Sequence, residues 1–420
     1  MLWQRVYPYA CLNIDCSWAQ WLEAVLRTIY TPYTRSSLNF RIARYFSSQD
    51  NVLVTACART IFDLYLQAMS FPLGSEVLMT AINIPEMSRI LRYHGLIPVP
   101  VDLNLHTLAA SPEAVEKAIT PRTKCIVVAM VYGTRYDLGP IAEVAKRHHL
   151  PIFEDCAEGF CGIQYSGSPH SAVSMFSFGP IKTCTAFGGA VAVVRDSRLY
   201  SAMNAIHSQY PPQPNSLYLK KVVKYALGII MLNIKFLHTF VRPLARKVWD
   251  YKKFVVGLMR GFPPSKDLLG KYRIQPAIGL LAFLHRRLKT FNPVEFEKSM
   301  QNLTEGQKIL SDGGVMVPGH LAEVRNFWLY PVMADNPSKS YDRLTDANVD
   351  AYRGISQLDV VEAPVGSAYE EPRNVQQMFD KLVYLPLHMA VTKSDVISMC
   401  RTIVKIIKEI EKEAAPKARL

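Results

Sequence analysis

KCIVVAMVYGTRYDLGPIAEVAKRHHLPIFED, residues 124–155, is the stretch that decides the fold class. It holds an apolar run at 124–131, a helical pattern at 139–149 and a second apolar run at 151–155. Neither run alternates polar with apolar residues, as a strand with one face in water would. Parallel strands that are buried on both faces need a crossover helix between them. The stretch therefore predicts a βαβ unit in a parallel sheet.

The same alternation continues toward the N-terminus and, beyond residue 155, to a strand that starts after Gly188-Gly189. One helix has Ser111 as its expected N-cap and Pro112 at its first helical position. We predict an α/β fold with a mainly parallel, doubly wound sheet that is covered on both faces. The further strands are expected at 51–56, 76–81, 97–101 and 172–178, and the further helices at 58–69, 85–94 and 111–119.

The chain of 420 residues is too long for one simple core. We expect four parts, and the smaller C-terminal part is expected to be a second α/β unit. It is predicted to have strands at 327–333, 357–363 and 381–387, a helix at 341–352, and a last helix opened by Thr392. The parts are an aromatic-rich arm at 1–45 that ends in a polar turn at 33–37, a large domain at 46–210, a helical insertion at 211–262 and the small domain at 263–420.

The net charge of +13 is concentrated in one segment. Residues 216–262 hold ten Lys or Arg against one acid, Asp250, which gives +9 and leaves the remainder near balance. This distribution argues against a general nucleic-acid binder. The longest uncharged run, 225–234, has ten residues and is too short to span a membrane. Two interpretations stay open: a helical element packed at a subunit interface, or an amphipathic element on an anionic membrane.

The cysteines and the N-terminus indicate a reducing compartment. Eight Cys are scattered without a CxxC or a Cys/His zinc spacing, so we expect small core residues and no metal site. The N-terminal residues lack the continuous apolar run of a secretory signal. We therefore expect a cytoplasmic protein.

One acid and one lysine stand out as candidate catalytic residues. Asp155 ends its strand at the edge where open α/β sheets bind ligands. Lys182 follows 27 residues later, in a turn of small residues and with no acid close in sequence. Such a lysine can be desolvated and kept neutral, as a Schiff-base amine must be. An acid and a lysine are the minimal equipment of a pyridoxal phosphate enzyme, although a strand-end cap and a solvated cation are the commoner roles.

Several motifs in order resemble the DegT-type sugar aminotransferases, a fold-type-I group of pyridoxal phosphate-dependent enzymes. The resemblance covers about 43–196 closely and 326–407 loosely. It implies that Lys182 binds the cofactor aldehyde and moves a proton, and that Asp155 pairs with the pyridine N–H. The motifs are VTACARTIFDL, ITPRTKCIVVAMVYG, LPIFEDCAEGF, SMFSFGPIKTCTAFGGAVAVV and VYLPLHMAVTKSDVISMCRTI.

The resemblance also implies a phosphate site. Ser177 matches the phosphate-binding serine of the family, and the backbone N–H groups of the turn at 56–60 would supply further contacts. Cys57-Ala58 replaces the usual Gly-Thr of the family, so a hydroxyl is missing. Arg59 or Thr60 is expected to compensate, and a solvated first-turn cation is the other interpretation of Arg59.

Three other positions depart from the family pattern. Glu158 stands where the family usually has Gln near the 3-hydroxyl of the cofactor, and a carboxylate there is repulsive unless it is protonated or bridged by water. Ile84 stands where the family has an aromatic ring stacked on the pyridine, and Gly179 where it often has His. These departures leave the cofactor better supported than the substrate.

The resemblance implies an aminotransferase that moves an amino group from glutamate to a keto group of a nucleotide-linked sugar. It implies a homodimer with a shared active site, to which the residue before a Tyr-Arg pair, here Lys271, would contribute, unless Lys271 is an ordinary surface cation. One alternative is another pyridoxal phosphate-dependent reaction, a lyase, a dehydratase or transamination of a non-sugar ketone. The other is a cofactor-free, membrane-associated scaffold.

Overall fold

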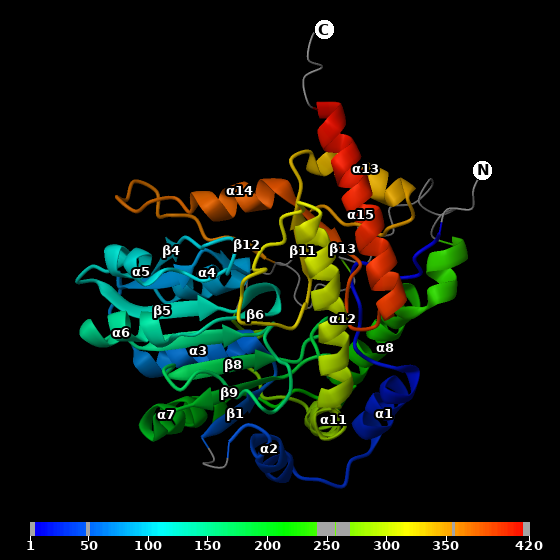
Figure 1. The fold of residues 1–420 in the computed structure, drawn as a ribbon. Coiled ribbons are helices and arrows are strands. Elements are labelled where there is room, and N and C mark those ends of the chain that lie inside the picture. Colours follow the sequence, from blue (N-terminus) through cyan, green and yellow to red (C-terminus); the bar gives the residue numbers. More distant parts are fainter. Residues whose placement is uncertain (1–4, 48–50, 242–256, 258–268, 355–357, 415–420) are drawn as a thin grey trace.

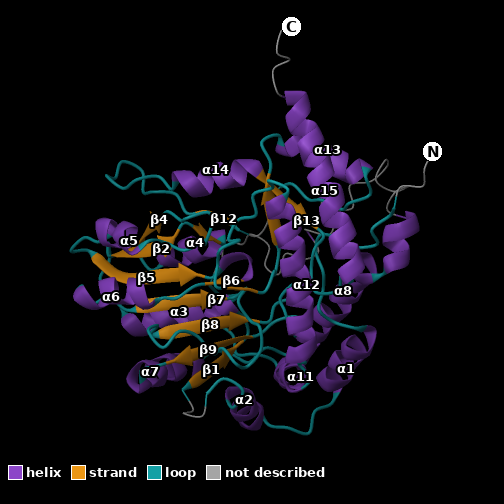
Figure 2. Ribbon diagram, in the orientation of Figure 1, coloured by secondary structure: helices purple, strands orange, loops and turns teal. Residues whose placement is uncertain are grey.

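The computed structural model describes residues 5–47, 51–241, 257, 269–354 and 358–414. A seven-stranded sheet with the order β1-β9-β8-β7-β5-β2-β4 forms its centre (Figures 1 and 2). The neighbouring strands β8, β7, β5, β2 and β4 are parallel, and β9 runs antiparallel to both β8 and β1. The predicted α/β class with a mainly parallel sheet is confirmed. The strands are β1 (Val52–Thr55), β2 (Glu76–Thr80), β4 (Ile97–Val101), β5 (Thr123–Ala129), β7 (Ile152–Cys156), β8 (Val173–Ser177) and β9 (Ala190–Val194).

Each face of the sheet has its own apolar core, which explains why the strands are apolar throughout. In β5, Ile126 and Val128 belong to one cluster, while Cys125 and Val127 belong to the other. Successive side chains of a strand point to opposite faces, so both faces must be apolar. The helices on the side of Cys125 are α3 (Ala58–Met69), α4 (Pro85–Tyr93) and α7 (Ser197–Ser208), and those on the side of Ile126 include α5 (Pro112–Ala118) and α6 (Gly139–Arg147).

The N-terminal segment forms two helices, α1 (Trp18–Ile29) and α2 (Arg35–Ala43). The prediction that 33–37 is a polar turn closing the arm is wrong. Thr34 is the N-cap of α2, and its hydroxyl accepts a hydrogen bond from Ser37 N, so the polar residues begin a helix. Both helices pack against α11 (Ile278–Lys289).

The insertion begins with a long helix, α8 (Asn215–Asn233), followed by a short π-helix at Leu237–Val241. Beyond Val241, the predicted 211–262 insertion lies outside the described residues, except for Gly257. Among the helices that the structure describes, none is long and apolar enough to cross a membrane.

The C-terminal part builds a third core around two antiparallel strands, β11 (Tyr330–Met333) and β13 (Leu382–Leu385). Two long helices, α12 (Pro293–Asp312) and α15 (Lys393–Ala414), pack on each other beside them. Thr392 caps α15, because its hydroxyl accepts a hydrogen bond from Asp395 N. The domain boundaries themselves stay a prediction.

The helix predicted at 341–352 is misplaced. The observed helix, α13 (Pro337–Asp346), begins after Asn336, whose side chain accepts a hydrogen bond from Lys339 N. Asn348 has a φ of 61°, and Tyr352 then pairs with Tyr384 as extended chain. The N-cap and the left-handed residue therefore set the limits of this helix, not the apolar spacing.

Short antiparallel pairs and one helix complete the described fold. Two of these pairs tie the C-terminal part to the sheet domain. They are β10 (Val324–Arg325) with β6 (Thr134–Arg135), and β12 (Asp359–Val360) with β3 (Ile82–Asn83); the remaining helix is α14 (Arg373–Lys381).

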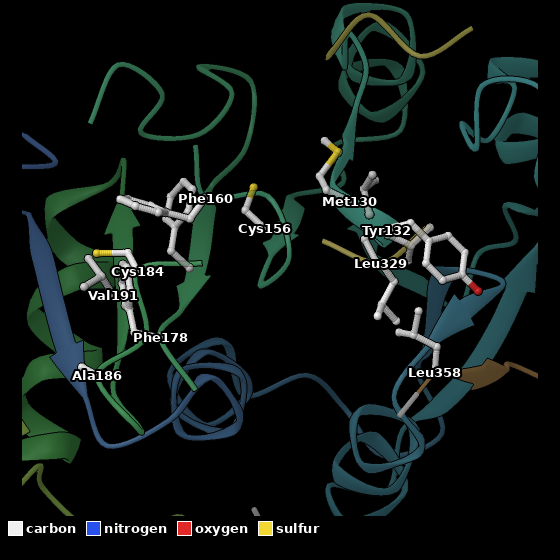
Figure 3. Close-up of a cluster of buried hydrophobic side chains, with 14 of the residues drawn as sticks. Met130, Tyr132, Cys156, Phe160, Phe178, Cys184, Ala186, Val191, Leu329 and Leu358 are labelled. Carbon is white, nitrogen blue, oxygen red and sulfur yellow. The ribbon is translucent and has the colours of Figure 1, made fainter. Parts of the chain in front are cut away.

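Phe178 offers a test of the core beside the Lys182 turn. Its fully buried ring lies 5.1 Å from the ring of Phe160 and close to Cys184, Ala186 and Val191 (Figure 3). We expect Phe178→Ala to lower the free energy of unfolding in urea by about 3–5 kcal/mol, through lost burial and a cavity. Phe40→Ala, at an exposed position of α2, is the control and should cost less than about 1 kcal/mol. Equal losses in the two variants would contradict this packing.

Candidate active site

The candidate residues gather at the carboxyl ends of β7 and β8, which are neighbours in the sheet. Asp155 is the second-last residue of β7, and Ser177 is the last residue of β8. Lys182 follows in a turn in which its N–H donates to Gly179 O. Because parallel strands end at the same edge, two loops that are distant in sequence meet here. The sheet order thus brings Asp155, Ser177 and Lys182 to one place.

Asp155 is a buried carboxylate whose proton affinity is raised. Burial raises its pKa to about 6, opposed by the hydrogen bond from Ala157 N to Oδ1 at 3.0 Å. The negative charge of Glu158 raises this pKa further, while the positive charges of Lys182 and Arg59 lower it. A cation held against this carboxylate would favour its ionised form. Asp155 is therefore suited to pair with a protonated ring nitrogen.

Lys182 is largely buried, with 12% of its side chain exposed, and makes two close contacts. Its Nζ lies 3.2 Å from Glu158 Oε1 and 3.6 Å from the centroid of the Trp328 ring. Burial lowers the pKa of Lys182, and the carboxylates of Glu158 and Asp155 oppose this effect. The sequence has no acid close to this lysine, but the fold supplies one from 24 residues away.

Glu158 is held by backbone groups as well as by Lys182. Its Oε2 accepts a hydrogen bond from Tyr132 N at 2.8 Å, and its carbonyl accepts one from Asn326 Nδ2 at 2.6 Å. Burial raises the pKa of the Glu158 carboxyl, and the Lys182 charge opposes this shift. Without the positive charge of Lys182 beside it, this carboxyl would take up a proton more readily. A protonated Glu158 would avoid the repulsion expected from the sequence.

Gly133, next to Tyr132, is required at this contact. It has a φ of 73°, and a Cβ there would lie 1.4 Å from Asn326 Oδ1. A larger residue would push Asn326 away from the Glu158 loop.

The turn before α3 lies within electrostatic range of this group. Cys57 is the N-cap and Ala58 the first residue of α3, so the first N–H groups of the helix are at this turn. Arg59 pairs with Glu86 at 3.4 Å, and its charge lowers the pKa of both Asp155 and Lys182. Of the two residues expected to compensate for the missing hydroxyl, Thr60 donates its own hydroxyl to Tyr272 O at 2.7 Å, which leaves Arg59 as the better candidate.

A second cation reaches the same turn from the insertion. Burial lowers the pKa of Lys221 on α8, and the charges of Lys224 and Arg59 lower it further. A Cβ built on Gly188 would lie 3.8 Å from both Lys221 Nζ and Ala56 O. Lys221 was not singled out from the sequence, because it is one of ten basic residues in a single segment.

The remaining predicted residues occupy the margins of the site. Ser177 is half-buried, and its Oγ accepts a hydrogen bond from Gly179 N at 3.4 Å. A Cβ on Gly179 would meet Ser177 Oγ at 3.6 Å, an ordinary contact that leaves room for a side chain. Ile84 is the half-buried N-cap of α4 and packs against both cores of the sheet. Its aliphatic side chain supplies apolar surface where the resemblance implies a ring.

Lys271 is exposed, while the two residues after it, Tyr272 and Arg273, pack within the same chain. Tyr272 accepts the hydrogen bond from Thr60, and Arg273 Nε lies 3.0 Å from Asp63 Oδ2 on α3. The Tyr-Arg pair thus lies against the helix that begins at the turn with Arg59.

Trp328 and Asn326 are the contacts that sequence reasoning missed. Both lie between β10 and β11, almost 150 residues after Lys182, and no local motif marks them. Only the apolar context of the strand pattern at 327–333 drew attention to this segment.

Comparison with known proteins finds similarity to aminotransferases. The model of the DegT/DnrJ/EryC1/StrS aminotransferase family matches residues 21–228. GDP-perosamine synthase of Escherichia coli O157:H7 is 30% identical over 220 residues, which cover 50% of this chain and 60% of that protein. L-glutamine:2-deoxy-scyllo-inosose aminotransferase of Streptoalloteichus tenebrarius is 31% identical over 215 residues, which cover 47% of this chain and 50% of that protein. The match thus spans about half to three fifths of these relatives.

The fold has close counterparts among solved structures. The structure of DesI in the presence of its TDP-sugar product superposes with a TM-score of 0.66 and 19% identity, covering 98% of this chain and 95% of that one. The fold is therefore that of these aminotransferases along nearly the whole chain. Residues 21–228, which carry Asp155, Glu158 and Lys182, thus match the model of the DegT/DnrJ/EryC1/StrS aminotransferase family.

Proposed function

We propose that this protein is a pyridoxal phosphate-dependent aminotransferase that moves an amino group, from glutamate, to a keto group of a nucleotide-linked sugar. The observation that carries the proposal is the buried amine of Lys182, 3.2 Å from Glu158 and in electrostatic contact with Asp155. The names of the relatives, a GDP-perosamine synthase and an aminotransferase of a cyclitol ketone, support the amino transfer and the sugar-like substrate.

The residues present fit the cofactor. Lys182 would bind its aldehyde, and Asp155 would pair with its ring nitrogen. Ser177 and the first N–H groups of α3, with Arg59 and Lys221 beside them, would bind its phosphate. When bound, the cofactor supplies an electron-accepting ring that stabilises negative charge on the substrate carbon.

The side chains of this chain then provide the proton chemistry. The amine of Lys182 is placed to take a proton from the substrate carbon and return it, because burial lowers its pKa and favours a neutral base. A protonated ring nitrogen beside Asp155 would favour the ionised carboxylate. The carboxylate would in turn keep that nitrogen protonated. Burial raises the pKa of Glu158 and the positive charge of Lys182 opposes this shift, so Glu158 takes up a proton more readily when Lys182 is uncharged.

Lys182→Ala tests the assignment of the amine. We expect the purified variant to lose the visible absorbance of the lysine-bound cofactor and to lose activity by at least about 10²-fold, because the base is removed. Lys146→Ala, at an exposed position of α6, should behave like the wild type. An unchanged spectrum in Lys182→Ala would refute the proposal.

The type of reaction is tested with ¹⁵N-labelled glutamate and a panel of keto-sugar nucleotides. We expect the label in the amino-sugar product, identified by mass spectrometry. A protein that binds the cofactor but transfers no label favours a lyase, a dehydratase or a non-sugar ketone instead. A protein that does not take up the cofactor supports the scaffold alternative.

We also propose a homodimer with a shared active site. The support is the exposed position of Lys271. The next two residues, Tyr272 and Arg273, contact α3, the helix that begins at the phosphate turn. In such a dimer, Lys271 would contact the phosphate site of the partner subunit.

Subunit mixing tests the shared site. We expect Lys182→Ala and Lys271→Ala proteins to be weakly active alone, and their mixture after subunit exchange to recover up to about a quarter of wild-type activity, since one site in four of the random mixture is intact. Sedimentation of the wild type should give a dimer. A mixture no more active than the sum of its parts would contradict the shared site.

We propose that the protein works in the cytoplasm and contacts an anionic membrane through the outer apolar face, defined here as the exposed apolar residues of α1, α8 and the segment 236–240 that follows α8. The two helices lie side by side at one edge of the molecule (Figure 1), where Trp21 Nε1 donates to Val222 O at 2.8 Å. Both also pack on α11, so the sides turned away from α11 face outward. The residues of this face are Trp18, Leu22, Leu26, Ile29, Leu217, Val223, Leu227, Ile230, Phe236 and Phe240, each 37–69% exposed.

The positive charge of this surface favours contact with an anionic membrane. Lys220 and Lys224 are exposed on α8, and the helix contains no acid. An apolar face edged by lysine and carrying aromatic rings is typical of helices that lie in the headgroup region of anionic bilayers.

Vesicle sedimentation tests the membrane contact. We expect vesicles with 30% phosphatidylserine to retain the protein more than pure phosphatidylcholine vesicles, and less so at high salt. Leu227→Glu should weaken retention, because it places an acid in the apolar face, whereas Leu321→Glu, an exposed leucine elsewhere, should not. If Leu227→Glu instead separates dimers into monomers and leaves retention unchanged, a second copy covers this face and the membrane proposal is wrong.

A further inference from the structure

Trp328 contacts the amine of Lys182 and the backbone carbonyl of the preceding residue, Ile181. We propose that Trp328 is a positioning residue that binds the ammonium form of the Lys182 side chain on its ring face and so sets the place and the proton affinity of that amine. The inference deepens the proposed function, on which it rests for one point: that Lys182 is the reactive amine.

The first support is the geometry of the two contacts. Lys182 Nζ lies 3.6 Å from the centroid of the indole ring, well inside the distance at which a cation is attracted to an aromatic face. The indole Nε1–H donates to Ile181 O at 2.7 Å, the carbonyl just before Lys182. One side chain therefore fixes both the backbone and the amine of the lysine.

The second support is the way in which the backbone of Trp328 is held. Asn326 Oδ1 accepts a hydrogen bond from Trp328 N at 3.1 Å, and Asn326 Nδ2 donates to Glu158 O at 2.6 Å. The backbones that carry the Trp328 ring and the Glu158 carboxylate are thereby joined through one asparagine. Phe327, between them, has a φ of 47°, a conformation that a bulky residue rarely adopts. Strained backbone of this kind is typical of segments that hold functional groups in place.

The third support is the set of charges around the amine. Glu158 and Asp155 favour its charged form, while burial and Arg59 oppose it. The cavity beside Lys182 is also lined by Asp15 and His388. Asp15 is paired with Arg287 at 2.9 Å, and burial lowers the pKa of His388 to about 4, so His388 is uncharged near neutral pH. The ring face is thus a neutral contact that stabilises the ammonium without adding a titrating group.

This contact has a use in amino transfer. If Lys182 holds the cofactor as proposed, its amine would be released in each half-reaction and would have to return to the same position. A fixed resting place against Trp328 keeps the free amine oriented and able to carry a proton.

The test measures the proton affinity of Lys182 without any turnover. The full-length chain is freed of bound cofactor with hydroxylamine and labelled with acetic anhydride across pH 6 to 11, and modification of the Lys182 peptide is followed by mass spectrometry. We expect the midpoint of Trp328→Met to fall by about one pH unit, the value of one desolvated cation–π contact. Trp328→Phe keeps a ring and should fall by less than half as much. Trp18→Leu, on exposed α1, is the control.

The direction of the shift separates this proposal from simple packing. If Trp328 only excluded water, its removal would hydrate the amine and move the midpoint upward. An upward shift, or no shift, in Trp328→Met overturns the proposal. Trp328→Leu replaces Trp328→Met if the latter does not fold. Because the labelling needs no cofactor, a protein that fails to bind pyridoxal phosphate refutes the proposed function and still gives a result on Trp328.

Discussion

The structure depends on the burial of one amine. Removing a lysine from water costs several kcal/mol unless other groups stabilise its charge. Here Glu158 at 3.2 Å and the face of Trp328 at 3.6 Å do so, while Asp155 adds a second negative charge. Glu158 follows β7 and Lys182 follows β8, and these strands are parallel neighbours. The contact therefore exists only because the sheet has this order.

The C-terminal part of the chain is needed to complete the site. Asn326 and Trp328 reach the Glu158 and Ile181 backbones from the segment between β10 and β11. The pairing of β10 with β6 fixes the start of this segment next to Thr134, close to Gly133 and Tyr132. A change in how the C-terminal part rests on the sheet would therefore change the surroundings of the Lys182 amine directly.

The sequence predicts the sheet well and the site only in part. Strands such as β5 are buried on both faces, so they give an uninterrupted apolar signal, and Ser111 marks its helix as expected. The polar residues at 33–37 were misjudged because capping residues and turn residues are the same types. Asp155 and Lys182 were found from their local settings. Glu158 as partner of the lysine, and Trp328, could not be, since tertiary packing alone brings them there.

The insertion is not an appendage to the sheet domain, although its composition suggests one. The inner side of α8 is buried: Tyr218 OH donates to Ala186 O at 2.8 Å, and Tyr225 stacks on Phe187 at 5.6 Å. Ala186 and Phe187 follow the Lys182 turn, in which Ala186 N and Gly188 N donate to Phe178 O. The helix α8, which carries part of the outer apolar face, thus also packs on the residues that follow Lys182. A membrane or a second copy bound to the outer side of α8 would therefore contact a helix that packs on the residues after Lys182.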